Sequence, residues 1–178
     1  MTTTDTTTGT TTDSTTDRTT GATRAELDEL RATVRTLSDR AEIAAVCDRY
    51  AMHLDRNRGD DDWFGAVFTE DVHLVFPMGE YKGMEGLAAF QRMARTTFAR
   101  THHLTGAYAI DLRGDEAEVR AHLTAFHVRD PAEPSAHFAI GGHYDARVVR
   151  TPAGWRIRSF TFDLVWNAGE APGAKGHS

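Results

Sequence analysis

Two polar side chains interrupt the apolar stripe of a helix that we predict over residues 39–55. The stripe follows the 3–4 spacing of one buried helix face and consists of Ile43, Val46, Cys47, Tyr50, Ala51 and Leu54. Tyr50 places a phenol within this stripe, and Asp55 lies at its edge near the C-terminal end, where the helix dipole disfavours a carboxylate. The helix either covers a sheet or also delivers a phenol and a carboxylate into a pocket.

The histidines that could do acid–base chemistry lie on two of the strands that we predict further along the chain. His102 and His103 are adjacent in a strand over 101–112, so alternation sends them to opposite faces and one of them can enter a pocket. His127 ends an otherwise apolar strand face, where its ring needs a polar partner. A histidine is the usual general acid or base near neutral pH. Beside a carboxylate it forms an acid–base dyad.

Familiar metal and cofactor motifs are absent from the sequence. The nine histidines form no HxH or HExxH pattern, and the single cysteine, Cys47, provides neither a thiolate ligand set nor a disulfide. There is no phosphate-binding loop, dinucleotide fingerprint or GxSxG elbow. We therefore expect neither a metal nor a cofactor.

The N-terminal third divides into a tail and two helices. Residues 1–23 are rich in threonine and predict a disordered tail. A short helix over 24–37 carries a stripe that could dock on the domain or pair as a coiled coil of two heptads; its members are Leu27, Leu30, Val34 and Leu37. We expect the next helix to restart at Ser38 or Asp39, with Asp39 and Glu42 as a capping box.

The remaining chain predicts an α+β fold. We expect a short helix over 61–68, a turn at 69–71, a strand over 73–77, a glycine-rich hairpin and a helix over 84–97. Four antiparallel strands follow over 101–112, 116–128, 137–150 and 154–167, and residues 171–178 form a flexible tail. Helices packed on one side of a curved sheet close it as a cone around an apolar pocket.

Composition limits the possible partners. A net charge of −6 and a pI near 5.8 argue against nucleic acid or an anionic membrane as the main partner. No apolar run approaches the ~20 residues that span a bilayer, and the start lacks a signal-peptide pattern. We expect one cytoplasmic domain over residues 24–170.

In the order and spacing of its sequence motifs, the chain resembles the SnoaL-like branch of the NTF2-like superfamily over about residues 24–170. The opening helix of that family is similar to DRAEIAAVCDRYAMHLD, and its second helix with the first strand is similar to DDWFGAVFTEDV. The later motifs are GEYKGMEGLAAF, THHL, RGDEAEVRAH, GGHYDARVVRTPAGWRI and the WNAG of residues 166–169. The resemblance implies a cone-shaped roll and a homodimer formed through the outer sheet face.

The resemblance also implies site residues. Dehydratases of this type use a tyrosine and an aspartate of the first helix and a histidine of a facing strand, which match Tyr50, Asp55 and His103. His127 matches the second histidine of scytalone dehydratase. The bile-acid dehydratase also has an aspartate and an arginine where this chain has Ala125 and Leu164. Further residues expected to line the substrate pocket are His53, Phe76, Leu123, Ala125, Tyr144, Phe162 and Trp166.

We therefore expect a cofactor-independent acid–base enzyme, a dehydratase, isomerase or cyclase. Its substrate would be a small, largely apolar oxygenated metabolite, such as a polyketide-like or steroid-like intermediate. Known members of the superfamily leave two alternatives open, because a fold does not decide a function. These are an epoxide hydrolase and a non-catalytic module for ligand binding or assembly.

Overall fold

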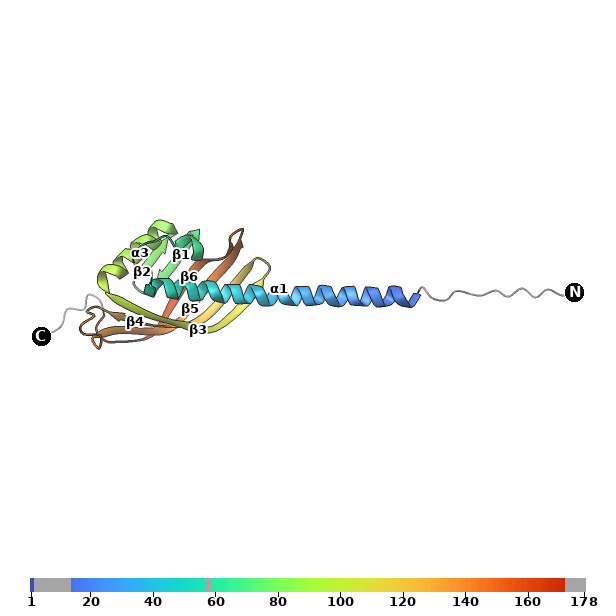
Figure 1. The fold of residues 1–178 in the computed structure, drawn as a ribbon. Coiled ribbons are helices and arrows are strands. Elements are labelled where there is room, and N and C mark those ends of the chain that lie inside the picture. Colours follow the sequence, from blue (N-terminus) through green and yellow to red (C-terminus); the bar gives the residue numbers. More distant parts are fainter. Residues whose placement is uncertain (2–13, 57–58, 172–178) are drawn as a thin grey trace. The chain divides into compact units, whose positions relative to one another are not determined.

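The computed structural model describes residues 1, 14–56 and 59–171 of the chain (Figure 1). The chain divides into two compact units, residues 1–39 and residues 40–178, which are described separately. Most of the expected N-terminal tail and nearly all of the expected C-terminal tail, residues 2–13 and 172–178, lie outside the described residues.

A single long helix, α1 (Ser14–Arg56), replaces the two helices expected in the N-terminal third. Residues 14–23 are helical, although they were expected within the disordered tail, and the predicted restart with a capping box at Asp39 and Glu42 is wrong. The stretch 22–56 contains neither glycine nor proline, and serine or aspartate within a helix costs only a few tenths of a kcal/mol. Nothing in the local sequence therefore ends the first helix.

The second unit is built on one six-stranded sheet with strand order β2-β1-β6-β5-β4-β3. Its neighbouring strands are antiparallel except for β1 and β6, which are parallel. The strands are β1 (Phe68–Phe76), β2 (Gly79–Lys82), β3 (Arg100–Arg113), β4 (Glu116–Val128), β5 (His137–Thr151) and β6 (Gly154–Ala168). The last four agree with the predicted strands to within one residue at each end. Thus the α+β fold with a mostly antiparallel sheet is confirmed.

The segment before the hairpin differs from the prediction. The helix α2 (Phe64–Val67) is only four residues long, and β1 already begins at Phe68, so the predicted turn at 69–71 is wrong. Phe68 is buried and pairs with Ile157 of β6, and the register is irregular between Phe68 and His73. Pairing with a strand distant in the sequence therefore extends β1 through residues that locally favour a turn.

The core of this unit lies between the end of α1 and the sheet. Ile43, Val46, Cys47 and Tyr50 of α1 are buried, as the stripe predicts. They meet the inward face of β4, where small and medium buried side chains alternate with exposed or half-buried ones; the buried residues are Ala117, Val119, Ala121, Leu123 and Ala125. Helix α3 (Gly83–Thr97) packs against β1 and β2 (Figure 1).

Gly142 lies where β5 is irregular, and a side chain there would collide with backbone. A Cβ atom on Gly142 would lie 2.0 Å from the carbonyl oxygen of Asp163 in β6. We expect Gly142→Ala to lower the free energy of unfolding by about 1–3 kcal/mol, because β6 must shift to admit the methyl group. Urea unfolding would measure this loss. Gly65→Ala, which meets nothing within 4 Å, is the control, and an equal effect of both substitutions would contradict the assignment.

Candidate active site

Asp55, in the last turn of α1, binds His103 of β3 through both carboxylate oxygens. Its Oδ1 lies 2.7 Å from His103 Nδ1, and its Oδ2 accepts the backbone N–H of His103 at 2.8 Å. The two side chains are largely buried, with 17% and 10% of their surface exposed. Because the carboxylate accepts the Nδ1 proton, Nε2 is left as the basic nitrogen of the ring.

Hydrogen bonds to the carboxylate set the ionisation of Asp55. Partial burial acts to raise its pKa, but the ring and the backbone N–H of His103, together with the Thr101 hydroxyl, more than offset burial and lower the pKa below its ordinary value. The Thr101 hydroxyl also donates to the carbonyl oxygen of Leu54 at 3.1 Å. Asp55 is therefore a carboxylate near neutral pH, fixed in place by β3.

The other histidines separate by strand face. The predicted alternation is confirmed, since the side chain of His102 is 66% exposed while His103 is turned inward. The ring centre of His127 lies 5.6 Å from that of His103, with the ring planes nearly perpendicular. His127 Nδ1 lies 3.2 Å from the carbonyl oxygen of Phe138, and its ring also packs against Phe98. Two inward imidazoles from neighbouring strands therefore lie together.

Tyr50 belongs to the aromatic core. Its ring packs edge-on against Phe68 and Phe160, with centroids 5.0 and 5.4 Å away. Complete burial raises the pKa of the phenol far above its ordinary value, so the hydroxyl keeps its proton and can act as a donor. Tyr50 also lines a cavity with Leu54, the residue before Asp55, and Thr105, which shares the inward face of β3 with His103. The phenol and the dyad thus lie along the same α1–β3 junction.

The cavity beside Tyr50 is small. It has about 10 Å³ for the centre of a water molecule, which is room for about one water. Its polar lining includes Thr105, whose hydroxyl oxygen is 3.1 Å from that of Tyr144, and the thiol of Cys47. Burial raises the pKa of this thiol to about 12, so it is no nucleophile. The ligand-sized apolar pocket expected from the sequence is therefore closed by its own aromatic side chains.

The remaining residues expected in the pocket lie either at the small cavity or in the packed side chains around it. Leu123 and Tyr144 line the small cavity. Ala125 and Phe162 are buried in the core, and Phe76 stacks on Phe90 of α3 with ring centres 4.5 Å apart. His53 stacks flat on Trp63 at 4.7 Å.

The prediction that Trp166 lines the inner pocket is wrong. Gly142 pairs with Leu164 but Gly141 pairs with Trp166, so Val165 is an extra residue in β6. An inserted residue reverses the alternation of the faces that follow it. The indole lies over Gly141, within 2.1 Å of where a Cβ would stand, and is 44% exposed. The bulge thus turns Trp166 to the sheet face opposite Leu164.

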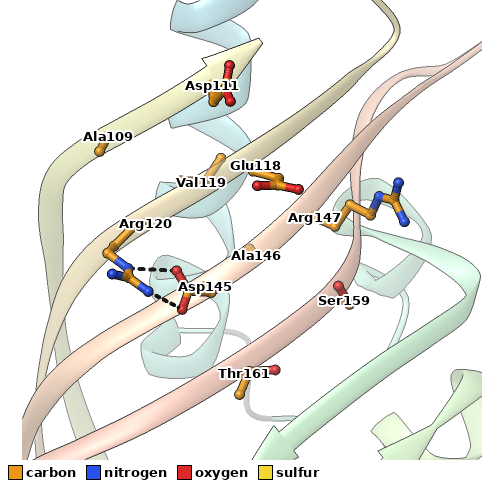
Figure 2. Close-up of a pocket in the computed structure, with 10 residues that line it drawn as sticks. All are labelled: Ala109, Asp111, Glu118, Val119, Arg120, Asp145, Ala146, Arg147, Ser159 and Thr161. Atoms are coloured by element: carbon orange, nitrogen blue, oxygen red, sulfur yellow. Dashed lines mark hydrogen bonds and ion pairs between the residues drawn. The ribbon is translucent and has the colours of Figure 1, made fainter. Parts of the chain in front are cut away.

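A larger hollow lies on the outer sheet face and is charged. It encloses about 680 Å³ over β3 to β6. Figure 2 shows Arg120 and Asp145 joined across it by two hydrogen bonds of 2.8 and 2.7 Å, with Glu118 and Arg147 further along the strands. Arg147 in turn donates to Glu116 at 2.7 Å. None of the ten residues that line the hollow is a histidine, and Asp55 and His103 are not among them, so the hollow is separate from the dyad.

Three polar residues with little or partial exposure, two on β3 and one on α3, were not predicted from the sequence. Thr101 and Thr105 lie two residues before and after His103, so strand alternation alone could have placed them beside it. Gln91 of α3 is 4% exposed, and its Nε2 has no hydrogen-bond partner among the described residues.

Within residues 14–56 and 59–171, no three histidine, cysteine, aspartate or glutamate side chains gather as a metal site. No helix of the same residues is long and apolar enough to cross a membrane.

A family model matches most of the chain. Residues 35–161, more than half of the chain, match the model of the SnoaL-like domain. The chain belongs to the SnoaL-like family. An uncharacterized protein of Mycobacterium tuberculosis strain H37Rv is 29% identical over 141 residues, which are 75% of this chain and 90% of that protein.

Solved structures share the NTF2-like fold. A Kribbella flavida protein, Kfla4162, is 26% identical, with a TM-score of 0.68 over 75% of this chain and 95% of its own. A provisionally named scytalone dehydratase of Novosphingobium aromaticivorans is 22% identical, with a TM-score of 0.69 over 82% and 99%. A hexachlorocyclohexane dehydrochlorinase, LinA, is 14% identical, with a TM-score of 0.66 over 80% and 99%. The predicted NTF2-like fold is therefore confirmed.

The Asp55–His103 pair should make stability depend on acid pH. Because the folded-state pKa of Asp55 lies below the ordinary value of 3.8, the pair stabilises the fold fully above that pH. The contribution is lost as the pH falls through the lowered pKa. We expect Asp55→Asn to show a flatter decline of unfolding free energy between pH 5 and 2.5 than the unmodified chain.

Urea unfolding at several pH values would measure both curves. Glu133→Gln is the matched control, because it removes an exposed carboxyl group in the same way. Parallel curves for Asp55→Asn and the unmodified chain would show that the pair does not stabilise the fold.

Proposed function

We propose that this chain is a cofactor-independent acid–base enzyme acting on a small, largely apolar, oxygenated metabolite. It removes a proton next to a carbonyl group, followed by loss of water, a double-bond shift or ring closure. The observation that carries the proposal is the buried Asp55–His103 pair, in which the carboxylate holds the imidazole in one tautomer. The SnoaL-like fold and its dehydratase-named and dehydrochlorinase-named neighbours support it.

In the dehydration form of the reaction, His103 Nε2 takes the proton from the carbon next to the carbonyl. The electron pair of that C–H bond forms the enolate, and then forms the carbon–carbon double bond as the hydroxyl group on the next carbon leaves. The departing oxygen then receives this proton from the His103 imidazolium, directly or through the neighbouring ring of His127, so the products are an unsaturated ketone and water and both imidazoles end neutral. Asp55 stabilises the imidazolium that forms in between and fixes its ring.

Two further side chains assist. Tyr50, which keeps its proton, donates to the oxygen that becomes the enolate. His127, whose ring centre lies 5.6 Å from that of His103, holds or protonates the departing oxygen. A substrate enters by displacing side chains around the small cavity, since that cavity holds about one water.

The substrate surroundings and the assembly are extensions of the same proposal. Leu123 and Tyr144, which line the cavity, contact the apolar body of the substrate. The chain forms a homodimer through its outer sheet face, where Leu104 and Trp166 are exposed. Polyketide-like and steroid-like intermediates have the required combination of rings, carbonyl groups and hydroxyl groups.

The first test is substitution of the base. A panel of cyclic β-hydroxyketones would be screened for enone absorbance and for deuterium uptake from heavy water. We expect His103→Gln to lower kcat by about 10²–10⁴-fold, the usual contribution of a general base. His122→Gln, which changes an exposed histidine on the outer face of β4, is the matched control and should retain activity. A folded His103→Gln variant with full turnover would refute the assignment, and inertness toward the whole panel would favour a binding module.

The second test concerns the phenol. We expect Tyr50→Phe to lower kcat by about 10²–10³-fold, as loss of an oxyanion donor does, while KM changes little. Its aromatic contacts remain, so the melting temperature should stay close to that of the unmodified chain. Tyr108→Phe removes a hydroxyl that binds Asp48 at a partly exposed position, and serves as the control. Equal kcat in Tyr50→Phe and the unmodified chain would exclude the phenol from the reaction.

A further inference from the structure

Four large apolar side chains of the first unit form an exposed stripe along α1. Leu27, Leu30, Val34 and Leu37 are 46%, 58%, 53% and 61% exposed, so no side chain of their own unit buries them. We refer to these four residues as the leucine stripe. A contiguous exposed apolar patch usually marks an interaction surface.

The leucine stripe has the spacing of a coiled-coil seam. The intervals of three, four and three residues place Leu27 and Val34 at a positions and Leu30 and Leu37 at d positions of two heptads. In parallel coiled coils a β-branched a residue with leucine at d favours two strands rather than three or four, and Val34 is such a residue. The other exposed positions of residues 24–38 are mainly charged, polar or alanine, as expected for the outer faces of such a helix.

Charges beside the leucine stripe complement one another in a parallel pair. Glu26 occupies a g position and Arg31 the following e position, and g-to-e′ contacts set partner choice in coiled coils. Within one helix Arg31 contacts Asp28 at 3.0 Å, an exposed pair that contributes little and can exchange. In an antiparallel pair centred on the stripe, Arg31 would instead face the partner's Arg31. The charges therefore favour the parallel arrangement.

The leucine stripe lies mostly outside the family domain. The family match begins at residue 35, after three of its four members. The stripe therefore lies largely outside the part of the chain that the family model describes.

We propose that the leucine stripe pairs with the same stripe of a second copy of this chain as a short parallel coiled coil. This contact is separate from the sheet face and does not depend on the proposed reaction. Two heptads are fewer than the three or four of an independent coiled coil, so the helices associate weakly and reversibly.

Disulfide trapping in the full chain tests this pairing. In a parallel pair the two 37 positions face each other, so Leu37→Cys should cross-link under mild oxidation. In the antiparallel alternative the same positions are about 15 Å apart along the axis. Ala32→Cys, on the opposite helix face, is the matched control. The native Cys47 is buried and does not compete.

We expect Leu37→Cys to form the covalent dimer at least ten times faster than Ala32→Cys at equal concentration, since paired helices hold the thiols at high effective concentration. Equal rates would overturn the proposal, whatever other interface the chain forms.

A charge exchange on the Leu37→Cys background then tests the register. Glu26→Arg and Arg31→Glu should each slow cross-linking, and the two together should restore it. If the double variant is as slow as either single one, the parallel register is wrong.

Discussion

The two-oxygen contact between Asp55 and His103 is the interaction on which the candidate site depends. Strand β3 is an edge strand that pairs only with β4, so half of its backbone groups face away from the sheet. The backbone N–H of His103 is one of these, and Asp55 satisfies it from the end of α1. The same carboxylate, which the helix dipole disfavours, gains a second donor from the His103 ring. Asp55 thus satisfies a backbone donor at the edge of the sheet, fixes the end of α1 against β3 and orients the imidazole ring of His103.

This anchoring explains why the surrounding side chains lie where they do. With the end of α1 held against β3, the buried stripe of residues 43–54 covers the inward faces of β3 to β6. Thr101 and Thr105 flank His103 on the same face of β3. The aromatic rings of Tyr50, Tyr144 and Phe160 then fill the interior and leave room for about one water. The polar contacts of Asp55 and His103 are therefore preorganised, whereas space for a ligand is not.

The sequence predicted features that follow from a regular period. Alternation and turn residues located β3 to β6 and placed His102 and His103 on opposite faces. Prediction from the sequence failed where a single inserted residue or a contact with a distant strand determines the local structure. The extra residue Val165 turns the side chain of Trp166 to the opposite face of the sheet. Pairing with β6 makes β1 begin as early as Phe68. The closed cavity depends on how aromatic rings pack together, which no single segment of the sequence specifies. The pairing of Asp55 with His103 came from family resemblance, because 48 residues separate the two in the chain.

The positions of the two inward histidines restrict the geometry of any elimination in which both act. His103 and His127 come from the neighbouring strands β3 and β4, and the rings lie on the same inward face of the sheet. A base and an acid on one wall reach the same face of a flat substrate. If His103 takes the proton and His127 serves the leaving oxygen, as proposed, the two groups depart from one side of the new double bond. This arrangement favours syn over anti elimination, and with it substrates in which the proton and the hydroxyl lie on the same ring face.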